Sequence, residues 1–214
     1  MTTVARPSKP YAQLRGERVW YATAGEYIGL GFHHILQGID HLLFVLGLLL
    51  IVKGRMALFK TISAFTVAHS ITLGIATLGY ASAPLPPLNA AIALSILFLG
   101  PEIIRTWRGE ISLTILYPWI VAFMFGLLHG FGFASGLSTT GMPKAEIPWA
   151  LLCFNVGVEI GQIGFVMLIL LLSRSFQILQ IQWPKWIERA PGYAVGVFGA
   201  YWTIQRTFIL FMGR

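Results

Sequence analysis

Long apolar segments are the feature that most constrains the fold of this chain. Six segments, each of roughly 20 or more residues, are long enough to cross the hydrocarbon core of a bilayer as helices. In hydrocarbon every backbone N–H and C=O must be paired within the protein, and a helix achieves this inside a single segment. We therefore predict an all-α, polytopic integral membrane helix bundle of about six transmembrane helices. The segments lie near 26–52, 57–79, 85–104, 114–138, 147–173 and 191–212.

The composition agrees with this prediction and limits the number of domains. The chain has 214 residues, of which 56% are hydrophobic and 11% charged, whereas soluble domains carry roughly 25% charged residues. Residues 1–25 are expected to form a polar N-terminal tail or an interfacial helix, because they lack the apolar core of a signal peptide. Residues 26–214 are expected to form the six-helix domain. The single cysteine, Cys153, excludes a disulfide framework and a cysteine-rich metal site.

The distribution of basic residues predicts the topology. The net charge is +7, but the basic residues cluster in short loops between apolar segments, which favours the lipid bilayer as partner and not nucleic acid. The second and fourth loops together hold only Lys144. The positive-inside rule then places the odd loops in the cytoplasm of a bacterial-type inner membrane, with both termini extracytoplasmic. Four basic residues of the tail argue the other way. The basic residues of the odd loops are Lys53, Arg55, Lys60, Arg105, Arg108, Arg174, Lys185 and Arg189.

Ionisable side chains inside the apolar segments are the main functional signal. An Asp at the centre of a membrane helix costs about 2.5–3.5 kcal/mol, so such residues indicate a functional site. Imidazole and carboxylate groups together are ligands for zinc, nickel or cobalt. At about 1.5 Å per residue these groups fall between the bilayer midplane and the outer half, so one shared metal site is predicted. The candidate ligands are His34, Asp40, His41, His69, His129 and Glu159.

Helical spacing predicts which side chains face the bundle interior. His34 and His41 are seven residues apart and share a face of a continuous helix, while Asp40 lies on another face about 100° away. Glycines four residues apart, such as Gly126 and Gly130, predict close helix packing. An interhelical hydrogen bond is the ordinary role of any one intramembrane histidine. The residues expected to support the site are Gln37, Thr66, Ser70, Asn155 and Gln162, whereas His33 is expected to be a bystander and Glu102 with Arg105 a solvated ion pair.

Five motifs in order along residues 27–172 resemble the signature of the HupE/UreJ family of membrane proteins. They are GFHHILQGIDHLLFVLGL at 31–48, FTVAHSITL at 65–73, IALSI at 92–96, FGLLHGFGFA at 125–134 and FNVGVEIGQ at 154–162. The family is linked to nickel-enzyme maturation through hydrogenase and urease accessory proteins, and its members are regarded as nickel or cobalt permeases. The resemblance implies that His34, Asp40 and His41 handle the metal first. The chain is most similar to the second branch of the family, although Asn89 stands where that branch has a glutamate.

Two main functions and a third alternative follow from these residues. The first is a nickel or cobalt permease, in which the ion is partly dehydrated at the intramembrane site and released to the cytoplasm. Uptake should then fall at low pH, because binding needs deprotonated ligands. The second is an intramembrane zinc-dependent hydrolase, with His41, His69 and His129 on zinc and Asp40 or Glu159 as general base. The third is a structural or sensor protein whose polar core only fixes helix register.

Overall fold

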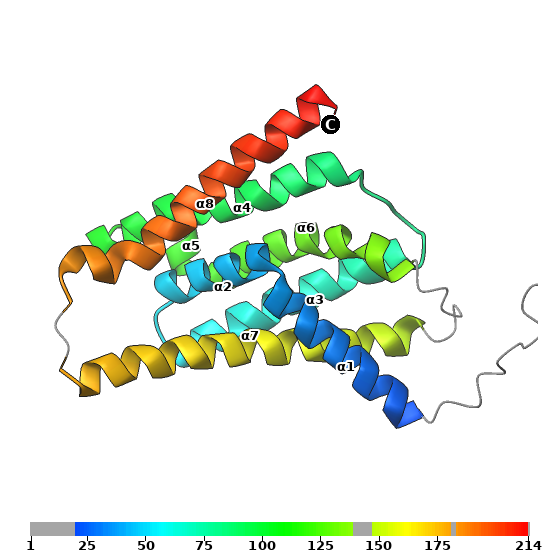
Figure 1. Ribbon diagram of the computed structural model, residues 1–214, viewed down its shortest axis with the longest axis horizontal. Helices are drawn as coiled ribbons and strands as arrows, with labels where there is room; N and C mark the ends of the chain where they lie inside the picture. Colours follow the sequence, from blue (N-terminus) through cyan, green and yellow to red (C-terminus); the bar gives the residue numbers. More distant parts are fainter. Residues whose placement is uncertain (1–19, 139–146, 181–182, 214) are drawn as a thin grey trace, which may run out of the picture.

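The computed structural model describes residues 20–138, 147–180 and 183–213, and these residues form a bundle of helices without a strand among them (Figure 1). The predicted fold class is therefore confirmed. In chain order the helices are α1 (Trp20–Gln37), α2 (Ile39–Ile51), α3 (Arg55–Thr77), α4 (Leu85–Arg108), α5 (Leu113–Leu116), α6 (Pro118–Ser138), α7 (Ile147–Ile178) and α8 (Lys185–Met212).

A helix lies at each of the six predicted segments, with one difference. The first segment is two helices, α1 and α2, which meet at an angle of 74° around Gly38. Among the described residues, α3, α4 and α7 are each long and apolar enough to cross a membrane, and the bent pair α1–α2 is a fourth candidate if it forms one broken span. The apolar part of α6 is shorter, over Pro118–Gly132. That α6 and α8 also span the bilayer stays a prediction.

The connections between helices alternate between the two ends of the bundle (Figure 1). The α2–α3 and α4–α6 connections, the C-terminal end of α7 and the start of α8 lie at one end. The α3–α4 connection, the start of α1 and the C-terminal end of α8 lie at the other. The basic residues of the odd loops therefore gather at one end of the molecule, as the positive-inside argument requires.

Glycines allow three pairs of helices to pack at backbone distance. A Cβ on Gly130 of α6 would lie 2.4 Å from the carbonyl oxygen of His69 on α3. A Cβ on Gly157 of α7 would lie 2.0 Å from the carbonyl oxygen of Ile28 on α1. A side chain at either position would force the helices apart, so these glycines set the spacing of the bundle. Glycines also line the α4–α8 contact at Gly100, Gly196 and Gly199.

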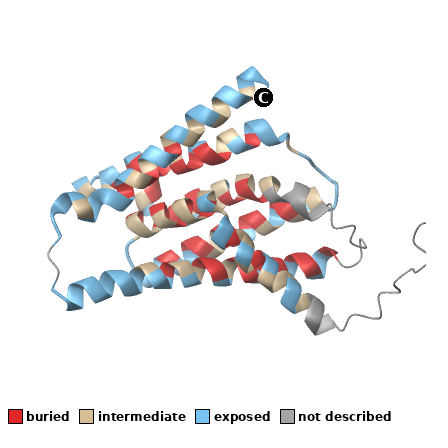
Figure 2. Cartoon of the chain, in the orientation of Figure 1, coloured by how far each residue is buried: buried red, intermediate tan, exposed pale blue. Residues whose placement is uncertain are grey.

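The buried residues lie in the middle of the bundle, and the outer faces and ends are exposed (Figure 2). The largest group of buried apolar side chains joins α2, α3, α4, α6 and α8. The outward face of α7 is also apolar, with Leu168 and Leu171 more than half exposed. A large exposed apolar face is what a bilayer covers. The central group consists of Phe44, Leu48, Ile51, Phe65, Ile96, Leu99, Ile103, Ala122 and Val195.

Candidate metal site

Four histidines from four helices come together in the interior. His41 of α2 is at the centre of the cluster, with ring centroids 5.0 Å from His34 of α1, 6.0 Å from His69 of α3 and 4.9 Å from His129 of α6. The rings of His34 and His69 are 6.2 Å apart. His41, His69 and His129 are buried, and His34 is partly buried. These four rings are called the histidine cluster below.

The bend at Gly38 brings His34 and His41 together. A Cβ at Gly38 would lie 2.8 Å from His41 Nδ1 and 3.0 Å from the carbonyl oxygen of His34. A side chain at this position would occupy space next to both histidines. The two rings therefore meet across a helix break, and not along one face of a continuous helix as their spacing predicted.

Close packing of α6 on α3 brings in the other two histidines. The glycine contact at Gly130 lies next to His129 in the sequence and against the backbone of His69. Phenylalanines fill the space around the cluster: Phe65 stacks on His69 at 6.1 Å and lies 5.2 Å from His129, and Phe154 lies 5.5 Å from His34. The histidines are thus enclosed by apolar and aromatic groups.

Several ring nitrogens in the cluster have no hydrogen-bond partner among the described residues. These are both ring nitrogens of His41, both of His69, and Nδ1 of His129. Buried polar groups are nearly always paired, because an unpaired one loses its hydrogen bonds to water without replacement. Unpaired imidazole nitrogens in a shared site are the donor set of a divalent ion of the zinc, nickel or cobalt type.

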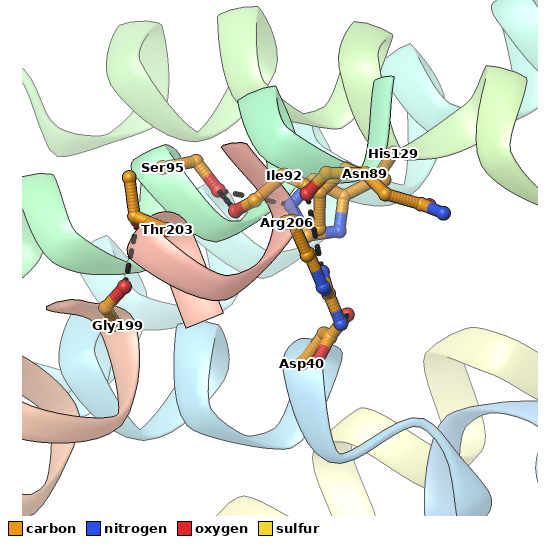
Figure 3. A network of polar contacts seen from close by, with 8 residues as sticks. All are labelled: Asp40, Asn89, Ile92, Ser95, His129, Gly199, Thr203 and Arg206. Atoms are coloured by element: carbon orange, nitrogen blue, oxygen red, sulfur yellow. Dashed lines mark hydrogen bonds and ion pairs between the residues drawn. The ribbon is translucent and has the colours of Figure 1, made fainter. Parts of the chain in front are cut away.

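Hydrogen bonds to Ser95 indicate the tautomer of His129 (Figure 3). Ser95 Oγ lies 3.1 Å from His129 Nε2 and donates its own proton to the carbonyl oxygen of Ile92 at 2.6 Å. A hydroxyl has one proton, so His129 Nε2 must be the donor in its bond with Ser95. The lone pair of His129 is then on Nδ1, the nitrogen without a partner. Such an outer hydrogen bond is how proteins orient metal-binding histidines.

In the conformation described, the cluster is not arranged as a closed metal site. Among the described residues no three His, Cys, Asp or Glu side chains are placed so that they could hold one ion. The ring of His41 lies edge-on to those of its neighbours, with interplanar angles of 67° to His34, 77° to His69 and 74° to His129. Binding by this cluster would need the rings to rotate toward a common point.

Asp40 lies beside the histidine cluster in sequence but has a different partner. Arg206 of α8 donates from Nη2 to Asp40 Oδ2 at 2.7 Å and from Nη1 to the backbone carbonyl oxygen of Asn89 at 3.2 Å (Figure 3). The side chains of Asp40 and Arg206 are only 24% and 23% exposed. Sequence reasoning missed Arg206, although a lone basic residue inside the last apolar segment was the available signal.

Glu159 also lies outside the histidine cluster. Ser63 donates to Glu159 at 2.5 Å, and Thr66 donates to Gln162 at 3.0 Å, so two polar pairs join α3 to α7. On α3, Thr66 and Ser63 are about one and two turns from His69, toward the end with the basic loops. Sequence reasoning did not identify Ser63.

The remaining predicted residues have varied surroundings. Ser70 donates to the carbonyl oxygen of Thr66 at 2.6 Å. Asn155 donates to the carbonyl oxygen of Leu151 at 2.8 Å, while its own side-chain oxygen has no partner among the described residues. Gln37 is exposed at the end of α1 and His33 is exposed on α1, and Cys153 is buried.

The predicted ion pair of Glu102 with Arg105 is present, but the expectation that Glu102 is solvated was wrong. Its side chain is buried, at 2% exposure. It accepts hydrogen bonds from Arg105 at 2.5 Å and from Ser112. Ser112 in turn caps α5 by accepting from the backbone N–H of Ile115. Glu102 therefore ties the end of α4 to the start of α5, and takes no part in the histidine cluster.

Comparison with known proteins identifies the family. No curated protein and no solved structure matches the chain. Residues 11–206 match the family described as HupE / UreJ protein. The match covers nearly the whole chain, including Arg206 and all four clustered histidines. The chain therefore belongs to the HupE/UreJ family of membrane proteins.

Proposed function

We propose that this protein is a permease for a divalent transition-metal ion, nickel or cobalt, which passes through the histidine cluster. The observation that carries the proposal is that His41 and His69 each bury both ring nitrogens without a partner among the described residues. An ion that arrives from water needs replacement ligands inside the bilayer, and neutral imidazoles provide them without adding charge. The link of the family to nickel-enzyme maturation supports nickel as cargo and a maturation system as its destination.

The spacing of the rings suits an ion shared by two or three histidines. At a metal–nitrogen distance of about 2.1 Å, two imidazoles on one ion have ring centres roughly 4.5–6.5 Å apart, depending on the angle between them. The four separations given above, between His41 and the other three rings and between His34 and His69, run from 4.9 to 6.2 Å. These separations are compatible with an ion between two of the imidazoles once their rings rotate toward it. His41 has the most contacts with the other rings, so it would be the shared ligand.

Arg206 provides a physical reason for release of the ion. Conduction requires that binding be weak enough for the ion to leave. A cation that arrives next to Asp40 meets the positive charge of Arg206, which lowers its affinity for the site. When no ion is present, Arg206 neutralises Asp40 and removes the cost of an isolated charge in the membrane. Arg206 would thus lower the affinity of the site for the ion and stabilise the protein when no ion is bound.

The polar pairs between α3 and α7 mark a direction for release. Ser63–Glu159 and Thr66–Gln162 continue from His69 toward the end of the bundle that carries the basic loops. If the basic end is cytoplasmic, as we propose for an inner-membrane protein with both termini outside, this route leads inward. Glu159 would then receive the ion after the histidines.

The position of the carboxylates favours transport over hydrolysis. A zinc hydrolase would need a general base within hydrogen-bond reach of a metal-bound water. Asp40 is held by Arg206, and Glu159 by Ser63. Among the described residues, neither of the two carboxylates considered as general base is therefore free beside the histidine cluster, whereas a permease requires no general base.

Uptake by the purified protein in proteoliposomes tests this function. Nickel and cobalt uptake would be followed with a metal-sensitive dye trapped inside the vesicles. We expect wild type to transport, His69→Ala to lose nearly all uptake, and His33→Ala, which changes an exposed histidine on α1, to match wild type.

Elemental mass spectrometry of the same preparation distinguishes the alternatives. Little metal as purified, with saturable nickel or cobalt binding that is lost in His41→Ala, supports the permease. About one zinc per chain that survives dialysis, is lost in His41→Ala and accompanies no uptake would overturn it in favour of the hydrolase. No binding of any divalent ion by wild type would leave only a structural role.

A further inference from the structure

A groove between α3 and α7 has the shape and charge of a lipid site. It has a volume of about 410 Å³. An arginine from each helix, Arg55 and Arg174, lies on its lining, and all other lining residues are apolar. It is separate from the histidine cluster. The apolar lining residues are Leu58, Phe59, Ile62, Ile163, Val166, Met167, Leu170 and Leu171.

The residues at the bottom of the groove are buried, and those along its sides are exposed. Leu58, Ile62 and Val166 are buried and pack together as one apolar group. Met167 and Leu171 are more than half exposed. The floor is thus fixed by the fold, while the walls are free to contact a hydrophobic ligand from the side of the bundle.

The length of the groove matches one leaflet of a bilayer. From Arg174 to Ile163 the helix rises about 16 Å at 1.5 Å per residue, close to half of a hydrocarbon core of about 30 Å. Because α3 and α7 run in opposite directions, the start of α3 at Arg55 and the final part of α7 at Arg174 lie at the same end (Figure 1). An acyl chain in the groove would therefore have its headgroup beside both arginines.

The positive charge at the end of the groove favours binding of an anion. Both arginines are exposed, and within the described chain neither makes a hydrogen bond or an ion pair. The start of α3 has no side-chain cap at Gly54, so its first N–H groups add to the positive potential. Two arginines beside a helix start form a suitable site for a phosphate group.

We propose that this groove binds an anionic phospholipid, with the phosphate between Arg55 and Arg174 and an acyl chain along Ile62 and Val166. A protein helix is a poorer fit, because the groove is only as long as one leaflet is thick and its two positive charges lie at the level of the lipid headgroups.

The test measures lipid binding to the purified full chain. Native mass spectrometry would count phosphatidylglycerol retained after delipidation and titration, with phosphatidylcholine and inorganic phosphate as separate arms. The double variant Arg55→Gln, Arg174→Gln should lose about tenfold or more in phosphatidylglycerol affinity, since each basic residue near a headgroup contributes about 1 kcal/mol. The matched control is Lys53→Gln, Arg108→Gln, which removes the same charge at the same end, outside the groove.

A second variant separates the acyl chain from the headgroup. Met167→Trp enlarges an exposed wall residue and leaves both arginines in place. It should reduce phosphatidylglycerol retention while the control double variant matches wild type. Equal loss in the control would overturn the proposal in favour of general surface charge. Equal retention of phosphatidylcholine would overturn the proposal that the two arginines select an anionic headgroup. Displacement of the lipid by inorganic phosphate would overturn the lipid in favour of a site for free anions.

Discussion

Arg206 Nη2 lies 2.7 Å from Asp40 Oδ2, so a cation supplied by the last helix neutralises the acid next to His41 in sequence. The two residues are 166 positions apart and join α8 to α2. Because both side chains are mostly buried, removal of one partner leaves the other charge without compensation. This ion pair links the stability of the bundle to the surroundings of the histidine cluster.

Asp40 and Arg206 should therefore show energetic coupling. Asp40→Asn and Arg206→Gln should each destabilise the protein, while the double variant should lose less than the sum, with a coupling of about 0.5–3 kcal/mol. Reversible unfolding in mixed detergent, for all four proteins, measures it. The exposed pair Arg108–Glu110, at 3.7 Å, is the control and should show coupling of about 0–1 kcal/mol. Additive effects at Asp40 and Arg206 would mean that the ion pair contributes nothing to stability.

Arg206→Gln should also tighten metal binding. Without the guanidinium, Asp40 is free to face an incoming ion and the repulsion on that ion disappears. We expect a lower Kd for nickel by isothermal titration and a slower maximal rate of uptake in proteoliposomes. Arg206→Lys, which keeps the charge, should stay closer to wild type in both. Weaker binding in Arg206→Gln would show that the arginine organises the site and does not oppose the ion.

Ser95→Ala should weaken metal binding without removing a ligand. Ser95 accepts from His129 Nε2, which leaves Nδ1 as the free lone pair in the cluster. Loss of such an outer partner typically lowers metal affinity about 10–100-fold. Nickel titration measures the change, and Ser175→Ala is the control because Ser175 bonds only the backbone of Leu171 on an exposed part of α7. An unchanged Kd would mean that His129 does not bind the ion through Nδ1.

The position of the histidine cluster was predictable from the sequence, but the reason for it was not. Histidines at similar depth in different apolar segments predicted a shared site, and His34, His41, His69 and His129 do meet. The seven-residue spacing of His34 and His41 suggested a continuous helix. The bend at Gly38 replaces it, because a glycine in an apolar run is compatible with both a straight and a broken helix.

The partners of the carboxylates could not be read from local pattern. Adjacent side chains on a helix point about 100° apart, so Asp40 and His41 were expected to diverge. Which group would meet Asp40 depends on the packing of α8 through Gly196 and Gly199 against α4. Likewise, Glu102 looked like a residue at a membrane edge, but it is buried and accepts a hydrogen bond from Ser112, the N-cap residue of α5 ten positions away. Such pairings are properties of the tertiary structure.

Gly130→Ala should strongly destabilise the bundle. The new methyl group would lie 2.0 Å from Thr72 Oγ1 and 2.4 Å from the carbonyl oxygen of His69, and the backbone cannot move away without shifting α3. Overpacking of this kind costs typically about 1–3 kcal/mol. Thermal unfolding in detergent measures the loss. Gly164→Ala is the matched control, because no atom lies within 4 Å of its added Cβ, and it should be neutral or slightly stabilising. Equal stability of the two variants would show that α3 and α6 are not held at this distance.

Glu159→Gln separates binding at the histidine cluster from passage along α3 and α7. Glutamine keeps the side-chain oxygen that accepts from Ser63, so the thermal stability should stay close to that of wild type. The negative charge is lost, and a cation leaving the histidines would then find a weaker next position. We therefore expect a several-fold slower uptake of nickel, because the ion loses one charge-assisted contact on its way out. The nickel Kd of the purified protein should stay unchanged. Gln162→Ala is the companion variant, because it removes a neutral partner of Thr66 on the same pair of helices and should affect uptake less. If Glu159→Gln raised the Kd as much as His69→Ala does, Glu159 would be a direct ligand that reaches the histidine cluster in the metal-bound state.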